Sequence, residues 1–481
     1  MQVWAPFRQG IPRAMPNALA FAALALWPVL ALWMFARLPL ERALIWTIVG
    51  GYMALPPVAA FDPPVVPALD KYAIANLSAL LGCMIHARGS VLALPRSPLA
   101  LGLFVAFIIS PLATTTTNGD PHFIGNGVLP GLRLYDAVSI MMGQVLFVLP
   151  FFLARTLLAS VEAHRDILRI LMLGGLIYSV PMLIEIRLSP QLNTWIYGFF
   201  QHSFLQMMRE GGFRPIVFMP HGLWVAFFAM SATFAAAALA RDAGAGRGGR
   251  LLAATAYLFT VLFLCKSLAS LLYAMALLPL ILMAPMRIVM WVAFAFALVA
   301  ISYPILRGGG FVPVEALADW AYGVDPDRGQ SLQFRFDNET MLLEKANDRP
   351  LFGWGSWGRN LIYDLETGRI LSVTDGRWII VIGMFGWLGY IAEFGLLTLP
   401  IMVLALRRVP GGVPVAVGAT ALLLGINLID MLPNATLLPI TWMMAGALQG
   451  HVERRAGDPA SETAPGTTPA GTGPRPLQSI L

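Results

Sequence analysis

The sequence contains few charged residues: Asp, Glu, Lys and Arg make up 12% of its 481 residues, whereas 58% are hydrophobic. In soluble globular chains about a quarter of the residues are charged. A chain of this size with so few charges cannot cover a water-exposed surface. The composition excludes a soluble globular protein and predicts an integral membrane protein of the all-α class.

Cysteine is also scarce, and its two residues, Cys83 and Cys265, both lie inside apolar runs. No Cys-x-x-Cys pair or Cys/His spacing accompanies them, so neither a disulfide framework nor a metal site is predicted. The net charge of +6 does not indicate nucleic-acid binding, because cationic loops beside membranes mostly set topology or contact anionic head groups. No small-x-small cleavage site follows 18–36, so we expect this first apolar stretch to be retained.

Apolar stretches that approach the length of a membrane-spanning helix, which needs about 20 residues, recur along the chain. We predict a polytopic protein with about 12 to 13 transmembrane helices. The candidate spans are 18–36, 43–61, 72–86, 98–114, 135–154, 167–186, 216–239, 251–266, 268–284, 287–306, 378–405, 413–431 and 436–450.

Arginines in short loops predict the orientation, because such loops stay in the cytoplasm. The spans place four arginine-bearing loops on one side: Arg88 and Arg96, Arg155 and Arg165, Arg241, Arg247 and Arg250, and Arg407 and Arg408. We expect that side to be cytoplasmic and 115–134, 187–215 and 307–377 to face outward. The side of the N-terminus stays open, because Arg8 and Arg13 oppose this orientation.

This topology divides the chain into four parts. A transmembrane bundle comprises 1–306, a large periplasmic loop 307–377, and C-terminal transmembrane helices 378–450. The tail 451–481 is rich in Gly, Pro and Thr, cannot bury enough apolar surface to fold, and is predicted to be a disordered cytoplasmic segment. Within the outer segments we expect a helix on the membrane surface over 190–210, from the spacing of Trp195, Phe199 and Met207. A second helix is expected over 332–345.

Four polar stretches fall on the predicted outer face or at the outer ends of spans. They read GGFRPIVFMPHG (211–222), LCKSLAS (264–270), QFRFDNETMLLEKANDRPLFGWG (333–355) and SVTDGRWIIVIGMFGWLG (372–389). Cations that converge at one membrane face are costly unless they are paired or hydrated, and an anionic ligand would explain them. Arginine offers a planar fork of donors for phosphate oxygens, whereas lysine acts as a point charge. Asp375, just ahead of a span, could orient or deprotonate a hydroxyl.

The order of these motifs resembles the bacterial O-antigen ligase and O-antigen/exopolysaccharide polymerase superfamily over about residues 210–390. The resemblance lies in R-P-x-x-F-x-x-H-G, K-S at a span junction, F-R followed by R-P-L-F-G-W-G, and T-D-G-x-W-I before G-x-x-G. Members move a glycan from a polyprenyl-diphosphate carrier to an acceptor, on the outer face of the inner membrane, without a metal or a nucleotide sugar.

The resemblance therefore implies a metal-independent membrane glycosyltransferase of the bacterial inner membrane that uses no cofactor. Its implied partners are a polyprenyl-diphosphate-linked oligosaccharide and membrane lipid, with chain-length regulators or export proteins as further candidates. By position, the residues implied for catalysis are Arg214, Lys266 and Arg335, and Asp375 joins them as the candidate base because it lies just ahead of a span. Those implied for substrate binding are His221, Arg349, Gly353, Trp354 and Gly355.

Asp375 stands where ligases usually carry a histidine, and Gly383 stands at the position of a ligase glutamate. This departure favours polymerisation of a surface polysaccharide or exopolysaccharide over ligation of O-antigen onto lipid A core. Two other classes stay open. A flippase or permease would use Glu393 and Asp430 as coupling sites, and a structural subunit of an export machine would use its arginines only as lipid contacts. Each candidate also has a plain structural interpretation, such as an interface anchor for Arg214, a helix cap for Asp375, or a tight turn for the glycines.

Overall fold

The computed structural model describes residues 15–63, 66–125, 127–209, 211–244, 246, 248–407 and 411–456. The predicted tail beyond 456 and Arg8, Arg13, Arg247 and Arg408 lie outside the described residues. The chain is 71% helical, in agreement with the predicted all-α membrane protein. The sheets in the described ranges are two small hairpins: β1 (His122–Ile124) with β2 (Gly127–Leu129), and β3 (Met208–Arg209) with β4 (Gly212–Phe213).

Each predicted span overlaps a helix of the structure, although those predicted over 43–61 and 216–239 are helical only in part. These helices are α1 (Ala18–Arg37), α2 (Leu40–Ala54), α3 (Lys71–His86), α4 (Pro98–Thr116), α5 (Leu134–Leu157), α6 (Val161–Leu188), α8 (Gly222–Ala243), α9 (Gly248–Leu264), α10 (Leu268–Met283), α11 (Met286–Gly308), α14 (Arg377–Leu406), α15 (Val415–Asp430) and α16 (Pro439–Ala456). Helix α16 extends over the first residues of the predicted tail, up to Ala456.

Seven helices of the described chain are long and apolar enough to cross a membrane: α1, α4, α5, α6, α8, α11 and α14. Three shorter apolar helices, α9, α10 and α15, do not reach that length. The count of about 12 to 13 crossings, which follows from the apolar runs, therefore stays a prediction. Helix α8 is the central one, because 89% of its most apolar window is buried, compared with 28% for α1.

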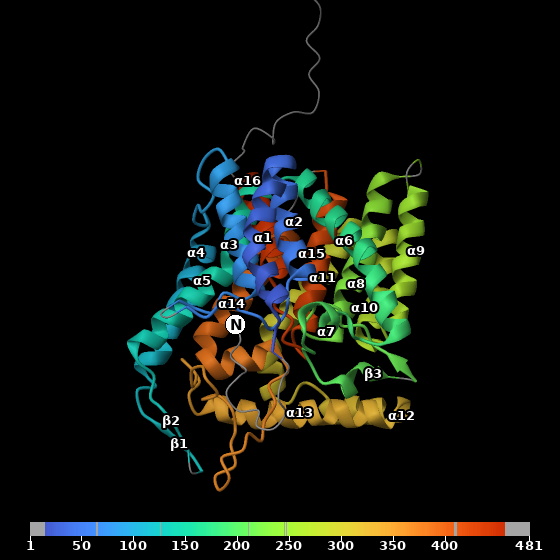
Figure 1. Ribbon diagram of the computed structural model, residues 1–481. Coiled ribbons are helices and arrows are strands. Elements are labelled where there is room, and N and C mark those ends of the chain that lie inside the picture. Colours follow the sequence, from blue (N-terminus) through green and yellow to red (C-terminus); the bar gives the residue numbers. More distant parts are fainter. Residues whose placement is uncertain are drawn as a thin grey trace, which may run out of the picture.

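The bundle has two chemically different ends, which Figure 1 shows at its top and bottom. At the basic end, short connections join α3 to α4, α5 to α6, α8 to α9 and α14 to α15. At the loop end lie the hairpins and two further helices, α12 (Val314–Val324) and α13 (Pro326–Asn347), which run across the bundle (Figure 1). The backbone N–H of Asn17 donates to the carbonyl of Tyr197 at 2.9 Å, so α1 begins at the loop end.

The predicted surface helix over 190–210 is wrong beyond Tyr197. Helix α7 (Leu192–Tyr197) stops at Gly198, whose left-handed conformation (φ +82°) ends the helix. A 3-10 turn, η1 (Phe204–Met207), follows separately. Phe199 and Met207 are buried in the protein, whereas Trp195 is exposed, so the three side chains do not share a lipid-facing stripe. The helix expected over 332–345 is present as part of the longer α13.

Helix α14 is sharply bent at Gly386, whose backbone is non-helical (φ 63°, ψ −162°). The bend is visible in the distance between Arg377 and Glu393, which are 16 positions apart. In a straight helix that separation would span about 24 Å. Instead, Arg377 Nε donates to Glu393 Oε1 at 2.7 Å, and Nη2 donates to the other carboxylate oxygen. The first limb of α14 therefore folds back toward the second.

The segment 350–355 pairs with the backbone groups that this bend frees. Four hydrogen bonds join them: Trp354 N to Gly383 O (2.8 Å), Gly355 N to Met384 O (2.9 Å), Trp387 N to Pro350 O (2.8 Å) and Leu388 N to Leu351 O (3.2 Å). In a membrane, an interrupted helix is tolerated only where neighbouring groups satisfy the freed carbonyls and amides. The segment 350–355, which we call the glycine-tryptophan loop, satisfies these groups of α14.

Two glycines make the close approach possible. A Cβ on Gly353 would lie 2.6 Å from the backbone of Met384 and Phe385, and one on Gly386 would lie 2.4 Å from the backbone of Leu351. Both glycines also have positive φ angles, +68° and +63°, which residues with a side chain rarely adopt. Glycine is therefore required at both positions for steric and for conformational reasons.

We predict that Gly353→Ala and Gly386→Ala each lower the free energy of unfolding by about 2 kcal/mol or more, because each combines backbone strain with a backbone clash. The thermal midpoint of the purified protein in detergent measures this loss. Gly102→Ala is the matched control, since it lies within α4 and a Cβ there meets no atom within 4 Å. If the two loop variants unfold at the same temperature as the control, the pairing of 350–355 with α14 is not what holds the bend.

Candidate functional site

The structure separates the nine candidate residues into two groups at the loop end. One group, Arg349, Gly353, Trp354 and Gly355, belongs to the loop that pairs with α14. The other group, which we call the cation cluster, consists of Arg214, His221, Lys266, Arg335 and Asp375. Its members come from distant parts of the chain.

Arg349 fixes the loop to the end of α4. Its Nη1 donates to Thr117 O at 2.7 Å and to Asn118 Oδ1 at 2.6 Å, and its Nη2 donates to Asp120 Oδ2 at 3.1 Å. The Asn118 amide in turn donates to Gly353 O at 2.9 Å. Arg349 therefore has a structural role, because it joins this loop to the distant segment that ends α4.

The Trp354 ring has two cationic neighbours. The Arg349 guanidinium lies 4.5 Å and the Lys345 ammonium 5.0 Å from the ring centroid, and the indole N–H donates to Lys345 O at 2.7 Å. Burial, together with the positive charge of the nearby Arg359, lowers the pKa of Lys345 to about 8. Arg359 is itself buried and donates to the carbonyls of Trp354, Pro130 and Asp120. Trp354 is thus embedded in loop packing.

Arg335 and Asp375 form an ion pair in the cation cluster. Arg335 Nε lies 3.5 Å from Asp375 Oδ2, and Arg335 Nη1 donates to Pro433 O (3.3 Å) and Asn434 Oδ1 (3.4 Å). Burial raises the pKa of Asp375, and the charge of Arg335 opposes that rise. The N-cap of α14 is Gly376, without a side-chain cap bond, so Asp375 is not the N-cap of this helix. Its carboxylate faces an arginine of α13 instead.

Arg214 and Lys266 meet at the junction of α9 and α10. Arg214 is 8% exposed, and its Nη2 donates to Lys266 O at 3.0 Å. The Lys266 ammonium donates to Arg209 O at 2.9 Å, and its backbone is left-handed (φ 52°). The strained backbone of Lys266 thus presents its carbonyl to the Arg214 guanidinium, and its ammonium group binds the β3–β4 hairpin.

His221 is the N-cap of α8, and its Nδ1 accepts a hydrogen bond from Leu223 N at 3.0 Å. Burial, together with the nearby His202, Arg214 and Arg335, lowers the pKa of His221 to about 3. The ring is therefore neutral at physiological pH, with its proton on Nε2 because Nδ1 is an acceptor. Its position places a neutral imidazole beside both arginines of the cluster.

A cavity of about 220 Å³ lies toward the loop end of the bundle, and we call it the outer cavity. Its walls come from α3, α5, α8, the first limb of α14 and the loop-end segments around 360, 374 and 436. Its polar lining includes Asn360, Thr374 and Arg377, and its aromatic lining includes Tyr72 and Trp224. Thr374 adjoins Asp375 in the chain, so the outer cavity borders the cluster.

Arg377, Asn360 and Thr374 are site residues that sequence reasoning does not single out. The mid-span carboxylate Glu393 gives a signal, because a charge in a span requires a partner. The partner, however, lies 16 positions away in the same helix, and only the bend at Gly386 brings it close. Asn360 and Thr374 carry no recognisable motif of their own.

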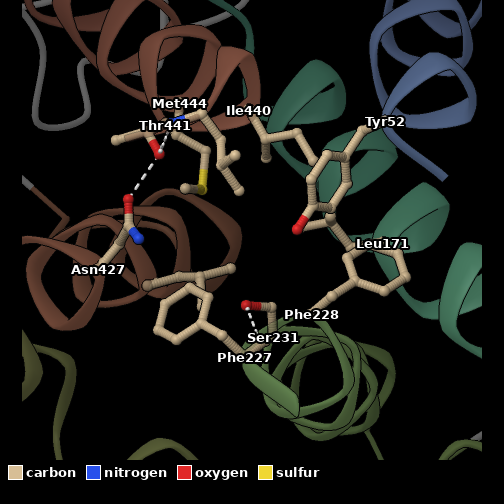
Figure 2. Close-up of a pocket in the computed structure, with 11 residues that line it drawn as sticks. Tyr52, Leu171, Phe227, Phe228, Ser231, Asn427, Ile440, Thr441 and Met444 are labelled. Atoms are coloured by element: carbon tan, nitrogen blue, oxygen red, sulfur yellow. Dashed lines mark hydrogen bonds between the residues drawn. The ribbon is translucent and has the colours of Figure 1, made fainter. Parts of the chain in front are cut away.

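A second, inner cavity of about 20 Å³ lies within the bundle and is lined in part by Tyr52, Ser231, Asn427 and Thr441 (Figure 2). Thr441 Oγ1 donates to Asn427 Oδ1 at 2.6 Å across its wall. This volume suffices for about one water molecule and is too small for a sugar or a lipid head group. The outer cavity is therefore the candidate functional site.

No protein-family model, curated protein or solved structure matches the chain. The chemistry of the chain's own residues is therefore the basis on which its function can be inferred.

Glu339 connects α13, which carries Arg335, to the rest of the site. Its carboxylate lies 3.5 Å from Arg307 Nε of α11 and accepts a hydrogen bond from Trp378 Nε1 at 3.4 Å. Burial raises the pKa of Glu339 to about 7 from an ordinary value of 4.5. A raised pKa in the folded state means that the fold favours the protonated form. The resulting stability is fully present below pH 4.5 and is lost as the pH rises through 7.

We predict that the wild type loses about 1 to 3 kcal/mol of stability between pH 4.5 and pH 8 through this group. Glu339→Gln should remove most of that pH dependence, because glutamine does not titrate. Thermal midpoints at pH 5 and pH 8 measure the effect. Glu344→Gln, an exposed carboxylate on the same helix, is the control and should titrate like the wild type. An unchanged pH dependence in Glu339→Gln would show that another group is responsible.

Proposed function

We propose that this protein is a membrane glycosyltransferase that transfers a glycan from a polyprenyl-diphosphate carrier to a sugar acceptor. The observation that carries the proposal is the convergence of Arg214, Arg335 and Asp375 beside the outer cavity at the loop end. The resemblance to O-antigen ligases and polymerases supports the same activity, in a bacterial inner membrane with the loop end toward the periplasm. Because Asp375 replaces the ligase histidine, polymerisation of a surface or exopolysaccharide is the favoured reaction.

In this mechanism the arginines act on the leaving group. The bond between the anomeric carbon and the diphosphate oxygen breaks, and negative charge develops on that oxygen. Arg214 and Arg335 stabilise this charge through their forked donors. Lys266 holds the Arg214 guanidinium through its carbonyl, which gives it a positioning role, and His221 contributes a neutral donor beside them.

Asp375 acts as the general base for the acceptor. A sugar hydroxyl attacks the anomeric carbon from the opposite face, which inverts the configuration, and its proton passes to the Asp375 carboxylate. Burial raises the pKa of Asp375 toward the working pH, which improves its efficiency as a base. Protonated Asp375 and a polyprenyl diphosphate remain after the transfer, so the atoms and the charge balance.

The flippase alternative receives less support from the groups that it would use. Glu393 is bound by Arg377 in a bidentate pair across the bend of α14. Asp430 accepts hydrogen bonds from Asn434 (3.2 Å) and Thr436 (2.8 Å) at the end of α15. Both carboxylates thus have structural partners. Release of polyprenyl diphosphate from a lipid-linked glycan by the purified protein distinguishes a transferase from a flippase or an export subunit. Release in the absence of lipid A core distinguishes a polymerase from a ligase, because a ligase requires that acceptor.

We predict that Arg214→Lys and Arg335→Lys each reduce transfer about a hundredfold, because lysine keeps the charge but loses the fork that contacts the diphosphate. Diphosphate release at matched protein levels measures the rate. Arg169→Lys is the control, because Arg169 lies near the basic end of α6 and is ion-paired with Asp166. Thermal midpoints close to the wild type confirm that both site variants are folded. Normal rates from folded Arg214→Lys and Arg335→Lys would remove the arginines from the mechanism.

A separate prediction concerns Asp375. Asp375→Asn preserves the shape and removes the proton acceptor, so transfer should fall by about a hundredfold to ten-thousandfold. Asp375→His should recover part of the activity relative to Asn, because a neutral imidazole can accept the proton. Asp319→Asn, which changes an exposed carboxylate of α12, serves as the control. If Asn matches the wild type while His abolishes transfer, Asp375 is a structural residue.

A further inference from the structure

Three polar side chains line the outer cavity with donors or acceptors that the described protein does not use. Asn360 is 7% exposed and Thr374 is 5% exposed, and neither side chain forms a hydrogen bond with any described residue. Arg377 contributes its Nη1, because the hydrogen bonds of its guanidinium to described residues involve Nε and Nη2 alone. Side chains as little exposed as Asn360 and Thr374 normally have hydrogen-bond partners, so their polar groups, together with Nη1 of the partly exposed Arg377, are available to a ligand in the cavity that they line.

The charge of the cavity wall is balanced. Glu393 is 1% exposed and binds the Arg377 guanidinium through both carboxylate oxygens, so the positive charge of Arg377 is neutralised within the wall. A buried anion in this cavity would lose its hydration without gaining a countercharge. The balanced pair therefore favours a neutral ligand with hydrogen-bonding groups, in contrast to the cation cluster next to it.

The donors, acceptors and apolar walls match a sugar ring. Arg377 Nη1 is a donor, whereas the Asn360 amide and the Thr374 hydroxyl can each donate and accept, as sugar hydroxyls do. Tyr72, Trp224 and Phe147 provide aromatic surface for the carbon-bound faces of the ring. A purely apolar occupant such as a prenyl chain would leave all three polar groups unbonded.

We infer that the outer cavity is a binding subsite for a neutral sugar, and that this sugar is the acceptor residue of the transfer. The first part stands on the cavity, and the second part rests on the proposed function. In this arrangement the acceptor hydroxyl enters beside Thr374, one residue from Asp375, and the diphosphate stays with the arginines of the cation cluster.

Equilibrium binding to the purified protein, without a lipid-linked donor, tests the subsite. Tryptophan fluorescence is followed while glucose, galactose, mannose, N-acetylglucosamine and their disaccharides are titrated, with inorganic diphosphate as the anionic probe. We expect at least one neutral sugar to bind. Thr374→Val and Asn360→Leu, which retain approximate size and remove hydrogen bonds, should each weaken that binding about three- to tenfold.

Thr260→Val is the matched control, because Thr260 is exposed on α9 and bonds only to the backbone of its own helix within the described chain. Its affinity for the sugar should equal that of the wild type. Sugar binding that Thr374→Val and Asn360→Leu leave unchanged would place the sugar elsewhere and overturn the assignment. The assignment would also be overturned if no neutral sugar bound. It would be overturned equally if diphosphate bound and this binding were weakened by Thr374→Val and Asn360→Leu but not by the control.

Turnover separates this inference from the proposed function. If the cavity variants lose sugar binding but the wild type never releases polyprenyl diphosphate, the neutral-sugar subsite stands and the transferase is wrong. If transfer occurs but the variants leave the KM for the acceptor unchanged, the transferase stands and the subsite is wrong. A raised KM for the acceptor, with an unchanged KM for the lipid-linked donor, is the result expected when both are correct.

Discussion

The pairing of 350–355 with the bend of α14 is the contact on which the loop end depends. A helix interrupted within a bundle exposes carbonyls and amides that a membrane cannot hydrate, and four backbone hydrogen bonds from the loop satisfy them. Because Gly353 and Gly386 lack side chains, the two backbones can approach closely enough to form these bonds. The bend turns the first limb of α14 back, and this limb carries Arg377 and forms one wall of the outer cavity. The glycine-tryptophan loop is thus the structural complement of a broken helix.

The arginines of the loop end differ in how tightly they are bound to other groups of the protein. Arg349 and Arg359 are engaged by backbone carbonyls and by Asp120, which accounts for their role in holding the loop. Arg377 is balanced by Glu393 in a bidentate pair. Arg335 has a longer contact with Asp375, 3.5 Å, and two long bonds to the segment after α15. Looser pairing leaves Arg335 better able to exchange partners for a ligand, which is why it belongs to the proposed site and Arg349 does not.

Local sequence patterns predict part of this architecture. Long apolar runs identify helices, and every predicted span overlaps a helix of the structure. The motif around Gly353 predicts a tight turn, but not its partner, because the pairing joins segments that are far apart in the sequence. The Arg377–Glu393 ion pair is likewise not predictable from the sequence. Helical periodicity assumes a straight helix, in which these two residues would lie far apart. The surface helix predicted over 190–210 is an error of the opposite kind, in which a local pattern predicted too much. Gly198 ends the helix, and Phe199 and Met207 are buried in the protein despite their helical spacing.

A transferase that joins a charged carrier to a neutral glycan must keep its two substrates in their proper places. If the cation cluster and the outer cavity serve these two substrates, their electrostatics are sufficient to sort them. A diphosphate in the outer cavity would lose its water without gaining a countercharge, because Glu393 already neutralises Arg377. At the cation cluster, by contrast, the guanidinium groups of Arg214 and Arg335 supply the positive charge that a diphosphate requires and a neutral sugar does not. The bend at Gly386 makes the cavity wall neutral, because it brings Glu393 to Arg377. The backbone pairing of 350–355 with α14 holds this bend, so it also determines the charge of the outer cavity.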